Sequence, residues 1–431
     1  MKKKLIFCIC MLLCVVFGFS TVPFAADTYE CDVTVTSSSV LVANIETDTI
    51  VYNKNIDTAR FISHLSNIMT YIVARNNVSD ISERVPIKAS VVNAHDNSDT
   101  TLDKFIGKTL SVKDLLHYVM MTNGSDACYV LADYVTKGKE DKFVELMNKK
   151  ARDLGCTKTR FSSPAAVNNS TQFSTCSDLY KIVLCALDTP DYTEIADTPT
   201  YIPDNYKDPK LTIGNTNSLL RAKSPYYFRH VKNGKYGYDV TAKGNIAAVS
   251  KYSDVSYVCI ILNAQRLSEH NAFTETKQLL TWAYTSLDNK RVVSEETVID
   301  TVYAQSSWGE SKIELTTGED IYMTMPAQFD ESKVTFDYVE LGAVELPVFY
   351  GQNMGTAKMY YDSDYVKDVD LIANTSDGIA MLEDLGSFAN TMLESTLVSN
   401  DDSKSSKEKV PTASEPTPKN KKEATATQSG K

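Results

Sequence analysis

The order in which two hydrophobic periodicities follow one another is the feature that most constrains this fold. Residues 33–52 alternate apolar with polar side chains and are rich in Val, Ile and Thr, with Glu46-Thr47-Asp48 at the turn of an expected β-hairpin. From Phe61 the apolar residues take a helical period, and residues 231–264 return to a strand-forming composition. Helices that lie between an N-terminal strand pair and later strands predict an α+β fold with a mainly antiparallel sheet.

The helical part of the pattern predicts several separate helices. The first starts near Phe61 and carries one apolar stripe, formed by Leu65, Ile68, Met69 and Ile72. Further helices are expected over residues 112–121, 126–135, 143–154 and 179–187. This many helices against one group of strands predicts a helical cluster beside the sheet.

The composition changes near Asn289, which marks an expected domain boundary. Residues 291–378 contain short strand-like runs and predict a separate small β-sandwich domain after a larger domain over residues 27–290. Residues 379–398 have apolar side chains at helical spacing, but all their charged residues are acidic. Docking on the protein is therefore favoured over membrane contact for this helix. Residues 399–431 are polar and charged and are expected to be disordered.

The N-terminus predicts export. Three lysines are followed by an apolar run from Leu5 to Phe19 and by small residues at Ala25 and Ala26, which is the pattern of a signal peptide over residues 1–26. Three of the 44 basic residues lie in this segment, which leaves 41 against 55 acidic residues and a net charge of −14. Such an acidic chain argues against nucleic acid as a partner.

The cysteines and histidines give no support for a metal or other cofactor. Six cysteines remain after residue 26, and three of them (Cys128, Cys185 and Cys259) lie in apolar runs, so buried unpaired thiols are favoured over disulfides, which an exported chain also permits. The five histidines are isolated, without a His-x-x-x-His pair or a Cys-x-x-Cys motif. No glycine-rich phosphate loop is present either.

An ordered set of short motifs resembles the D-alanyl-D-alanine carboxypeptidases, which are low-molecular-weight penicillin-binding proteins of peptidase family S11. The strongest run is residues 115–127, in which Leu115-Leu116 leads into Thr-Asn-Gly-Ser-Asp-Ala. Matching pieces follow at residues 143–164, 174–179 and 215–220 in the family's order. The resemblance covers residues from about 31 to 287, and it implies a penicillin-binding or β-lactamase-like domain followed by the family's small β domain.

The resemblance also implies a catalytic site made of three motifs. In the family, a Ser and a Lys three residues apart share one helix face, so the amine takes the hydroxyl proton while the Ser attacks the D-Ala-D-Ala carbonyl. A Ser-x-Asn motif relays protons, and a Lys-Thr-Gly motif on a strand edge binds the terminal carboxylate of the peptide. Each of these roles requires its own residue type.

The first motif is altered in this chain although its helix is preserved. His64 stands at the position of the nucleophile and Asn67 at that of the general base. An amide does not accept a proton at neutral pH, so we interpret His64 as a polar, hydrogen-bonded cleft residue rather than a catalyst. Ser66 lies about 200° around the helix from His64 and is interpreted as structural.

The second and third motifs are altered as well. Asn123-Gly124-Ser125 exchanges the two polar residues of the second motif, and Ser125 is interpreted first as the N-cap of the following helix. Lys235-Tyr236-Gly237 stands for the third motif, after an Asn233-Gly234 pair that suits a hairpin turn. Counting back from Gly244 shifts this match by one residue, and the Thr hydroxyl is absent in either register. Lys235 is interpreted either as a surface lysine on a hairpin or as part of a carboxylate-binding site with Tyr236 and Gly237.

These observations favour an exported cell-wall protein that has kept the fold but lost acyl transfer. Its expected partner is a peptidoglycan stem peptide or a protein of cell-wall synthesis. One alternative is an active D,D-carboxypeptidase with a non-standard site, as the family resemblance alone would imply. The other is a structural envelope protein in which the cleft is closed. The residues of the site carry more weight here than the fold, because one fold serves many functions.

Overall fold

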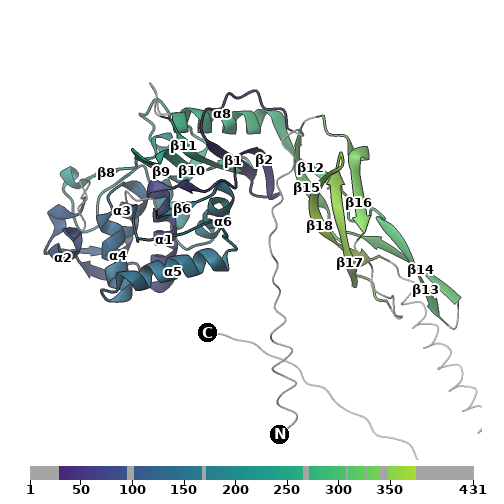
Figure 1. Ribbon diagram of the computed structural model, residues 1–431, viewed down its shortest axis with the longest axis horizontal. Coiled ribbons are helices and arrows are strands. Elements are labelled where there is room, and N and C mark those ends of the chain that lie inside the picture. The colour runs from purple at the N-terminus through teal and green to yellow at the C-terminus, as the bar shows by residue number, and fades with distance from the viewer. Residues whose placement is uncertain are drawn as a thin grey trace, which may run out of the picture.

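The structure is a computed structural model that describes residues 29–94, 101–166, 171–265, 271–306, 309–326, 328–338 and 348–374. It consists of a larger body of sheet and helices and a smaller body of strands that extends from one end of it (Figure 1). This confirms the expected α+β class with a small all-β domain after it.

The larger body is built on a five-stranded antiparallel sheet with the strand order β2-β1-β11-β10-β9. The strands are β1 (Ser39–Asn44), β2 (Thr49–Lys54), β9 (Val231–Asp239), β10 (Lys243–Tyr252) and β11 (Val255–Ala264). Strand β11 is central and is a nearly continuous run of Val, Ile, Cys and Leu, because both of its faces are buried. Strand β9 stands last in the sheet, so the described residues place a neighbouring strand on only one of its edges.

Helices cover both faces of this sheet (Figure 1). One face packs on the cluster formed by α1 (Ser66–Asn77), α2 (Ala89–Val92), α3 (Val112–Met121), α4 (Asp126–Thr136), α5 (Glu140–Asp153), α6 (Cys176–Leu187) and α7 (Tyr192–Asp197). The other face is covered by α8 (Asn271–Ser286). The alternation of side chains along a strand explains the division: Leu41 joins the core of the helical cluster, whereas Val40 and Val42 join the core beneath α8.

Short elements connect these layers. They are the strands β3 (Arg60–Phe61), β4 (Arg84–Pro86), β5 (Thr109–Ser111), β6 (Phe173–Ser174), β7 (Thr200–Tyr201) and β8 (Ile213–Gly214), and the 3-10 turns η2 (Ser63–Leu65), η3 (Asp103–Phe105), η4 (Pro209–Leu211) and η5 (Ser218–Leu220). Strand β3 pairs with β6 and leads directly into η2 and α1. This pairing fixes the start of α1, where the first family motif lies.

The smaller body begins where α8 ends. Strand β12 (Leu287–Val293) pairs with β15 (Ile321–Pro326), and a five-stranded sheet has the order β13-β14-β18-β17-β16. The strands of that sheet are β13 (Asp300–Ser306), β14 (Gly309–Thr316), β16 (Val334–Tyr338), β17 (Asn353–Tyr361) and β18 (Asp364–Ala373), with the turn η6 (Glu331–Lys333) before β16. The Tyr29 hydroxyl donates to the Thr324 carbonyl at 2.7 Å, which joins the two bodies.

The sequence predicts most of these elements but misplaces one turn. The hairpin of β1 and β2 and both ends of α3 are confirmed. The turn at Asn233-Gly234 is wrong, because both residues lie inside β9 and the chain reverses over residues 240–242. Gly234 has a φ of +143°, and a β-carbon there would lie 2.2 Å from the Ala247 carbonyl oxygen. The glycine is therefore required by the close approach of β10 rather than by a turn.

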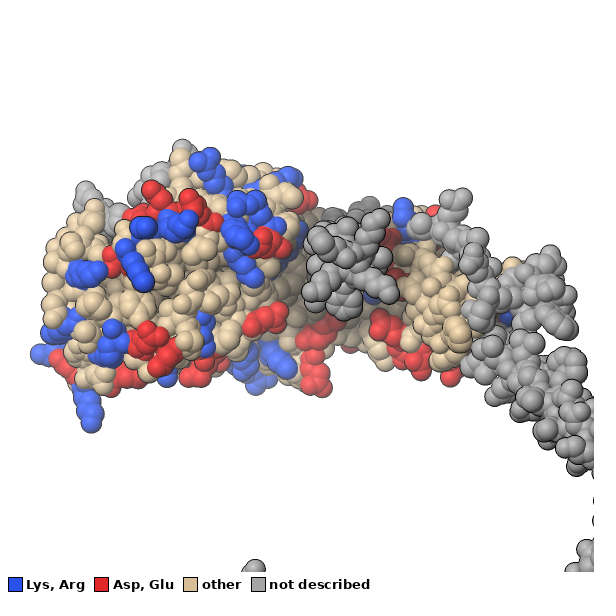
Figure 2. Space-filling model, turned by 90° about the horizontal axis from the view of Figure 1, so that it is seen from below, with Lys and Arg blue, Asp and Glu red and all other residues tan. Residues whose placement is uncertain are grey.

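Several predicted segments lie outside the described residues: the signal peptide over 1–26, the helix over 379–398 and the tail over 399–431. Within the described part of the chain, no helix has the length and apolar composition needed to cross a bilayer. The six cysteines after residue 26 are unpaired in the structure, and Cys31 and Cys185 are only half-buried. Charged side chains of both signs are interspersed on the face of the larger body seen in Figure 2.

Candidate active site

The fold brings the three altered motifs together. His64 lies in η2 before α1, Asn123 and Ser125 lie in the loop between α3 and α4, and Gly237 lies on β9. A β-carbon on Gly237 would lie 2.7 Å from the His64 β-carbon, so the strand passes directly against this histidine. The Thr216 hydroxyl connects the other two motifs, since it lies 3.4 Å both from the Asn123 side-chain oxygen and from the Tyr236 carbonyl oxygen.

The imidazole of His64 is held between all three motifs. Its Nδ1 lies 2.9 Å from the Ser63 hydroxyl, and the ring also hydrogen-bonds to the backbone of Asn123. Ser63 has a φ of +45°, a left-handed conformation that a non-glycine residue seldom adopts. Burial and the positive charge of Lys235 lower the pKa of His64 to about 4. The imidazole is therefore neutral at pH 7.

Asn67 is directed at helix α3. Its amide nitrogen donates to the Val119 carbonyl at 3.0 Å, and the residue is fully buried. Its amide oxygen is buried and has no hydrogen-bond partner among the described residues. Asn67, which the sequence predicts at the family's general-base position, is therefore a neutral group bonded to the end of a helix.

Lys235 is completely buried, so the interpretation as a surface lysine is wrong. Its Nζ donates to the Met120 carbonyl at 3.1 Å and to the Thr122 carbonyl. Burial lowers the pKa of its ammonium to about 7. The side chain crosses from β9 to the end of α3, where carbonyl groups lack helical partners and a cation complements the helix dipole.

The last carbonyls of α3 thus receive donors from the inherited motif positions. The Asn67 amide donates to the Val119 carbonyl and the Lys235 amine to the Met120 carbonyl. The backbone N–H of Thr216 donates to the Met121 carbonyl at 2.8 Å. The sequence does not indicate this capping, because the donors come from α1, from β9 and from the segment before η5. The family-like run over residues 215–220 is the only sequence signal that points to Thr216.

Ser125 takes a different role from the one expected. It occupies the N-cap position of α4 but makes no side-chain capping bond, and its hydroxyl donates to the Ala166 carbonyl at 3.3 Å. Asp126 instead binds the segment just before η3. Its carboxylate accepts the backbone N–H of Leu102 at 2.6 Å. Ser66 is structural, as expected, because its buried hydroxyl donates to the Ser63 carbonyl at 3.1 Å.

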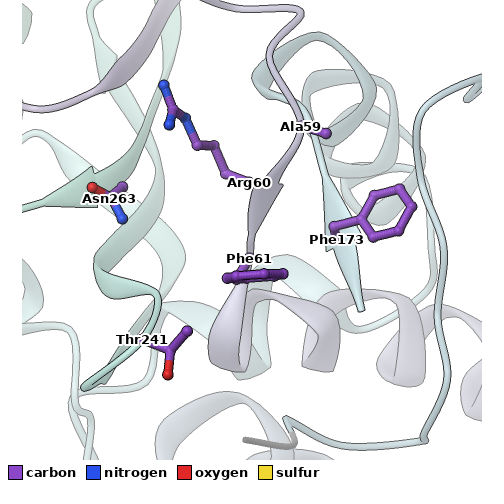
Figure 3. A pocket seen from close by; sticks show the side chains of 6 residues that line it. All are labelled: Ala59, Arg60, Phe61, Phe173, Thr241 and Asn263. Atoms are coloured by element: carbon purple, nitrogen blue, oxygen red, sulfur yellow. The ribbon is translucent and has the colours of Figure 1, made fainter. Parts of the chain in front are cut away.

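A cavity of about 330 Å³ lies beside this site rather than in it. Figure 3 shows its lining, in which Phe61 is three residues before His64 but none of the motif residues takes part. A second cavity, of about 740 Å³, lies along α5 and residues 156–162. The motif residues His64 and Gly237 are packed directly against one another, and this cavity lies next to them.

Comparison with known proteins agrees with this geometry. Residues 25–266 match the family model described as D-alanyl-D-alanine carboxypeptidase, and residues 288–377 match the C-terminal domain of penicillin-binding protein 5. The chain is 25% identical to the D-alanyl-D-alanine carboxypeptidase DacF of Bacillus subtilis over 338 residues, which cover 77% of this chain and 83% of that protein. It is 27% identical to DacC of Escherichia coli over 278 residues, covering 63% and 66% of the two chains.

Solved structures show the same architecture. Penicillin-binding protein 5 from Haemophilus influenzae superimposes with a TM-score of 0.64 at 21% identity, over 80% of this chain and 98% of that one. A peptidoglycan synthesis regulatory factor, PBP3 from Streptococcus pneumoniae, superimposes with a TM-score of 0.61 at 18% identity, over 80% and 99%. Since the family model spans more than half of the chain, the protein belongs to the D-alanyl-D-alanine carboxypeptidase family.

Proposed function

We propose that this protein is an exported cell-wall protein that binds peptidoglycan stem peptides, or a protein of cell-wall synthesis, without acyl transfer. The observation that carries the proposal is the chemistry at the two Ser-x-x-Lys positions. His64 and Asn67 are held by internal hydrogen bonds, and neither supplies a hydroxyl nucleophile or an amine base.

Acyl transfer needs an attacking oxygen and a group that takes its proton. Asn67 cannot take that proton, because its amide is neutral and its nitrogen is already bonded to Val119. Lys235 lies nearby, but its amine is bonded to the carbonyls at the end of α3. Proton transfer along the family's route is therefore blocked at its first step.

One contact favours the alternative of an active enzyme with a non-standard site. The Ser63 hydroxyl lies within hydrogen-bond reach of the His64 Nδ1, as a nucleophile and its base would. Two features weaken this alternative. Ser63 is only 7% exposed, and an imidazole with a pKa of about 4 is a weak base for a serine hydroxyl at neutral pH.

Peptide binding rests on the edge of β9. This strand ends the sheet, and an extended peptide can add to such an edge through backbone hydrogen bonds. We assign ligand contact to Tyr236 and Gly237 through their backbone. Lys235, which the sequence places in the same site, supports the strand from behind, because its buried amine is bonded to carbonyls at the end of α3. Gly237 has no side chain on the side of His64, which lets the histidine pack directly against the strand.

Labelling with a fluorescent penicillin tests the loss of acyl transfer. We expect no covalent band for the mature protein on a denaturing gel, because no acyl-enzyme forms. The double variant His64→Ser with Asn67→Lys restores the family's residues and should give a covalent band. A Ser63→Ala variant is the matched control, since a wild-type band that disappears in this variant would establish Ser63 as the nucleophile and overturn the proposal.

Titration calorimetry tests the binding part. A diacetylated Lys-D-Ala-D-Ala peptide should bind the unlabelled protein, and the L-Ala-L-Ala peptide should bind at least tenfold more weakly, because a strand edge flanked by a fixed side chain discriminates chirality. If neither peptide gives a binding signal, peptide binding is excluded. A structural envelope protein, or one that binds a protein of cell-wall synthesis, is then favoured.

A further inference from the structure

The cavity beside the altered motifs is lined by one cation, two aromatic rings and two small polar side chains. Arg60 and Phe61 come from β3, Phe173 from β6, Thr241 from the turn after β9 and Asn263 from β11, with Ala59 at the rim. Figure 3 shows Arg60 extending toward the side of Asn263, while the Phe173 ring lies on the opposite side. A volume of about 330 Å³ is at the small end of the range for ligand sites.

The guanidinium of Arg60 uses only one of its N–H donors within the described residues. Its Nε donates to the Ser39 hydroxyl at 3.1 Å, which is the one hydrogen bond it makes with the described residues. No carboxylate of the described chain forms an ion pair with it. A guanidinium that is anchored through Nε keeps its terminal N–H groups in a planar fork, which matches the two oxygens of a carboxylate.

The remaining lining residues set the ligand's other requirements. The Asp239 carboxylate accepts the backbone N–H of Thr241 at 2.7 Å, so this acid is hydrogen-bonded within the turn after β9. The Thr241 hydroxyl has no partner among the described residues. The Asn263 side chain accepts a hydrogen bond from the Ser38 hydroxyl at 2.9 Å and is thereby fixed. Phe61 and Phe173 offer half-buried ring surface for an apolar group.

We propose that this pocket binds the carboxylate of a small N-acylated amino acid or of a peptide C-terminus, with Arg60 as the anion-binding residue. The carboxylate oxygens accept from the terminal nitrogens of Arg60, and the apolar side chain of the ligand lies against the two phenylalanine rings. The pocket uses none of the motif residues, so this inference does not depend on the function proposed above.

Calorimetric titration of the whole mature protein tests the inference, with N-acetylphenylalanine and its carboxamide as paired probes. The carboxylate form should bind at least tenfold more tightly, because only it pairs with the guanidinium. Arg60→Gln should weaken binding of the acid at least tenfold, whereas Arg221→Gln, which removes a solvent-exposed arginine elsewhere, should leave it unchanged. A pentapeptide that ends in phenylalanine, tested as free acid and as amide, distinguishes a peptide C-terminus from a small free acid.

Two variants at the exposed residue Thr241 keep the test independent of folding. Thr241→Glu places a carboxylate at the pocket and should weaken binding of the acid at least fivefold relative to the matched neutral variant Thr241→Gln. Equal affinities for acid and amide, equal affinities for the Glu and Gln variants, or no binding of either probe would each overturn the inference.

Discussion

The cluster of motif residues around His64 and the pocket beside it differ in the hydrogen bonds that their polar side chains make. In the cleft, Asn67 and Lys235 donate to carbonyl groups at the end of α3, and His64 is held by Ser63 and Asn123. In the pocket, Arg60 is a lining residue, and its guanidinium makes a single hydrogen bond with the described chain. The side chains of the motif residues are therefore engaged inside the protein, whereas the pocket offers a side-chain cation.

This difference shows how a fold persists when the chemistry of its site changes. Asn67 and Lys235 contribute to internal hydrogen bonding at the end of α3, which is a physical reason for these residues that does not involve a substrate. Substitutions of these residues should therefore lower the free energy of unfolding, and the size of each loss should follow the number of buried polar groups left without partners.

The largest effect is expected for Lys235→Met. The substitution keeps the apolar stem but removes the donor from two buried carbonyls, so the free energy of unfolding should fall by about 3 kcal/mol. Urea unfolding measures this change. Lys251→Met, at an exposed lysine on the neighbouring strand, is the matched control and should alter stability by less than about 0.5 kcal/mol. Equal losses in the two variants would contradict the capping role of Lys235.

A smaller effect is expected when the pH falls. The pKa of His64 is about 4 in the folded chain against a usual 6.5, so the unfolded chain binds the proton more readily. The contribution of His64 is complete above pH 6.5 and is lost as the pH falls toward 4, with a total of about 2 kcal/mol after allowance for partial exposure. Comparing the urea midpoints of the wild type and His64→Gln across this range isolates the effect. Parallel curves for the two proteins would show that the imidazole titrates normally.

The sequence predicts the framework better than the site, and the reason is the range of the interactions. Helix α3 is predicted at both ends because its apolar period is local. The burial of Lys235 depends on carbonyls 113 and 115 residues away in sequence, which no local pattern encodes. The misplaced turn at Gly234 has the same cause, since the contact that requires a glycine comes from Ala247 on the neighbouring strand.

The cleft positions themselves illustrate the same limit. The sequence predicts His64 and Asn67 at the family's Ser and Lys positions once the resemblance is recognised, and these residue types predict the loss of acyl transfer. What each new side chain does instead is set by the end of α3 and by the closeness of β9. Arg60 carries no sequence signal of its own, because its importance comes from the cavity formed by β3, β6, β11 and a turn.

The smallest effect is expected for Asn67→Leu, which compares two opposing costs at one position. The leucine removes the donor to the Val119 carbonyl. It also removes a buried amide oxygen that has no partner in the described part of the chain, and the two side chains are similar in volume. The free energy of unfolding should therefore change by less than about 1 kcal/mol, whereas Asn67→Ala adds a cavity and should cost about 2 kcal/mol. Thermal unfolding of both variants measures the difference. A loss as large as that of Lys235→Met would mean that the amide oxygen has a partner in solution, such as an ordered water, and that this part of the cleft is hydrated rather than packed.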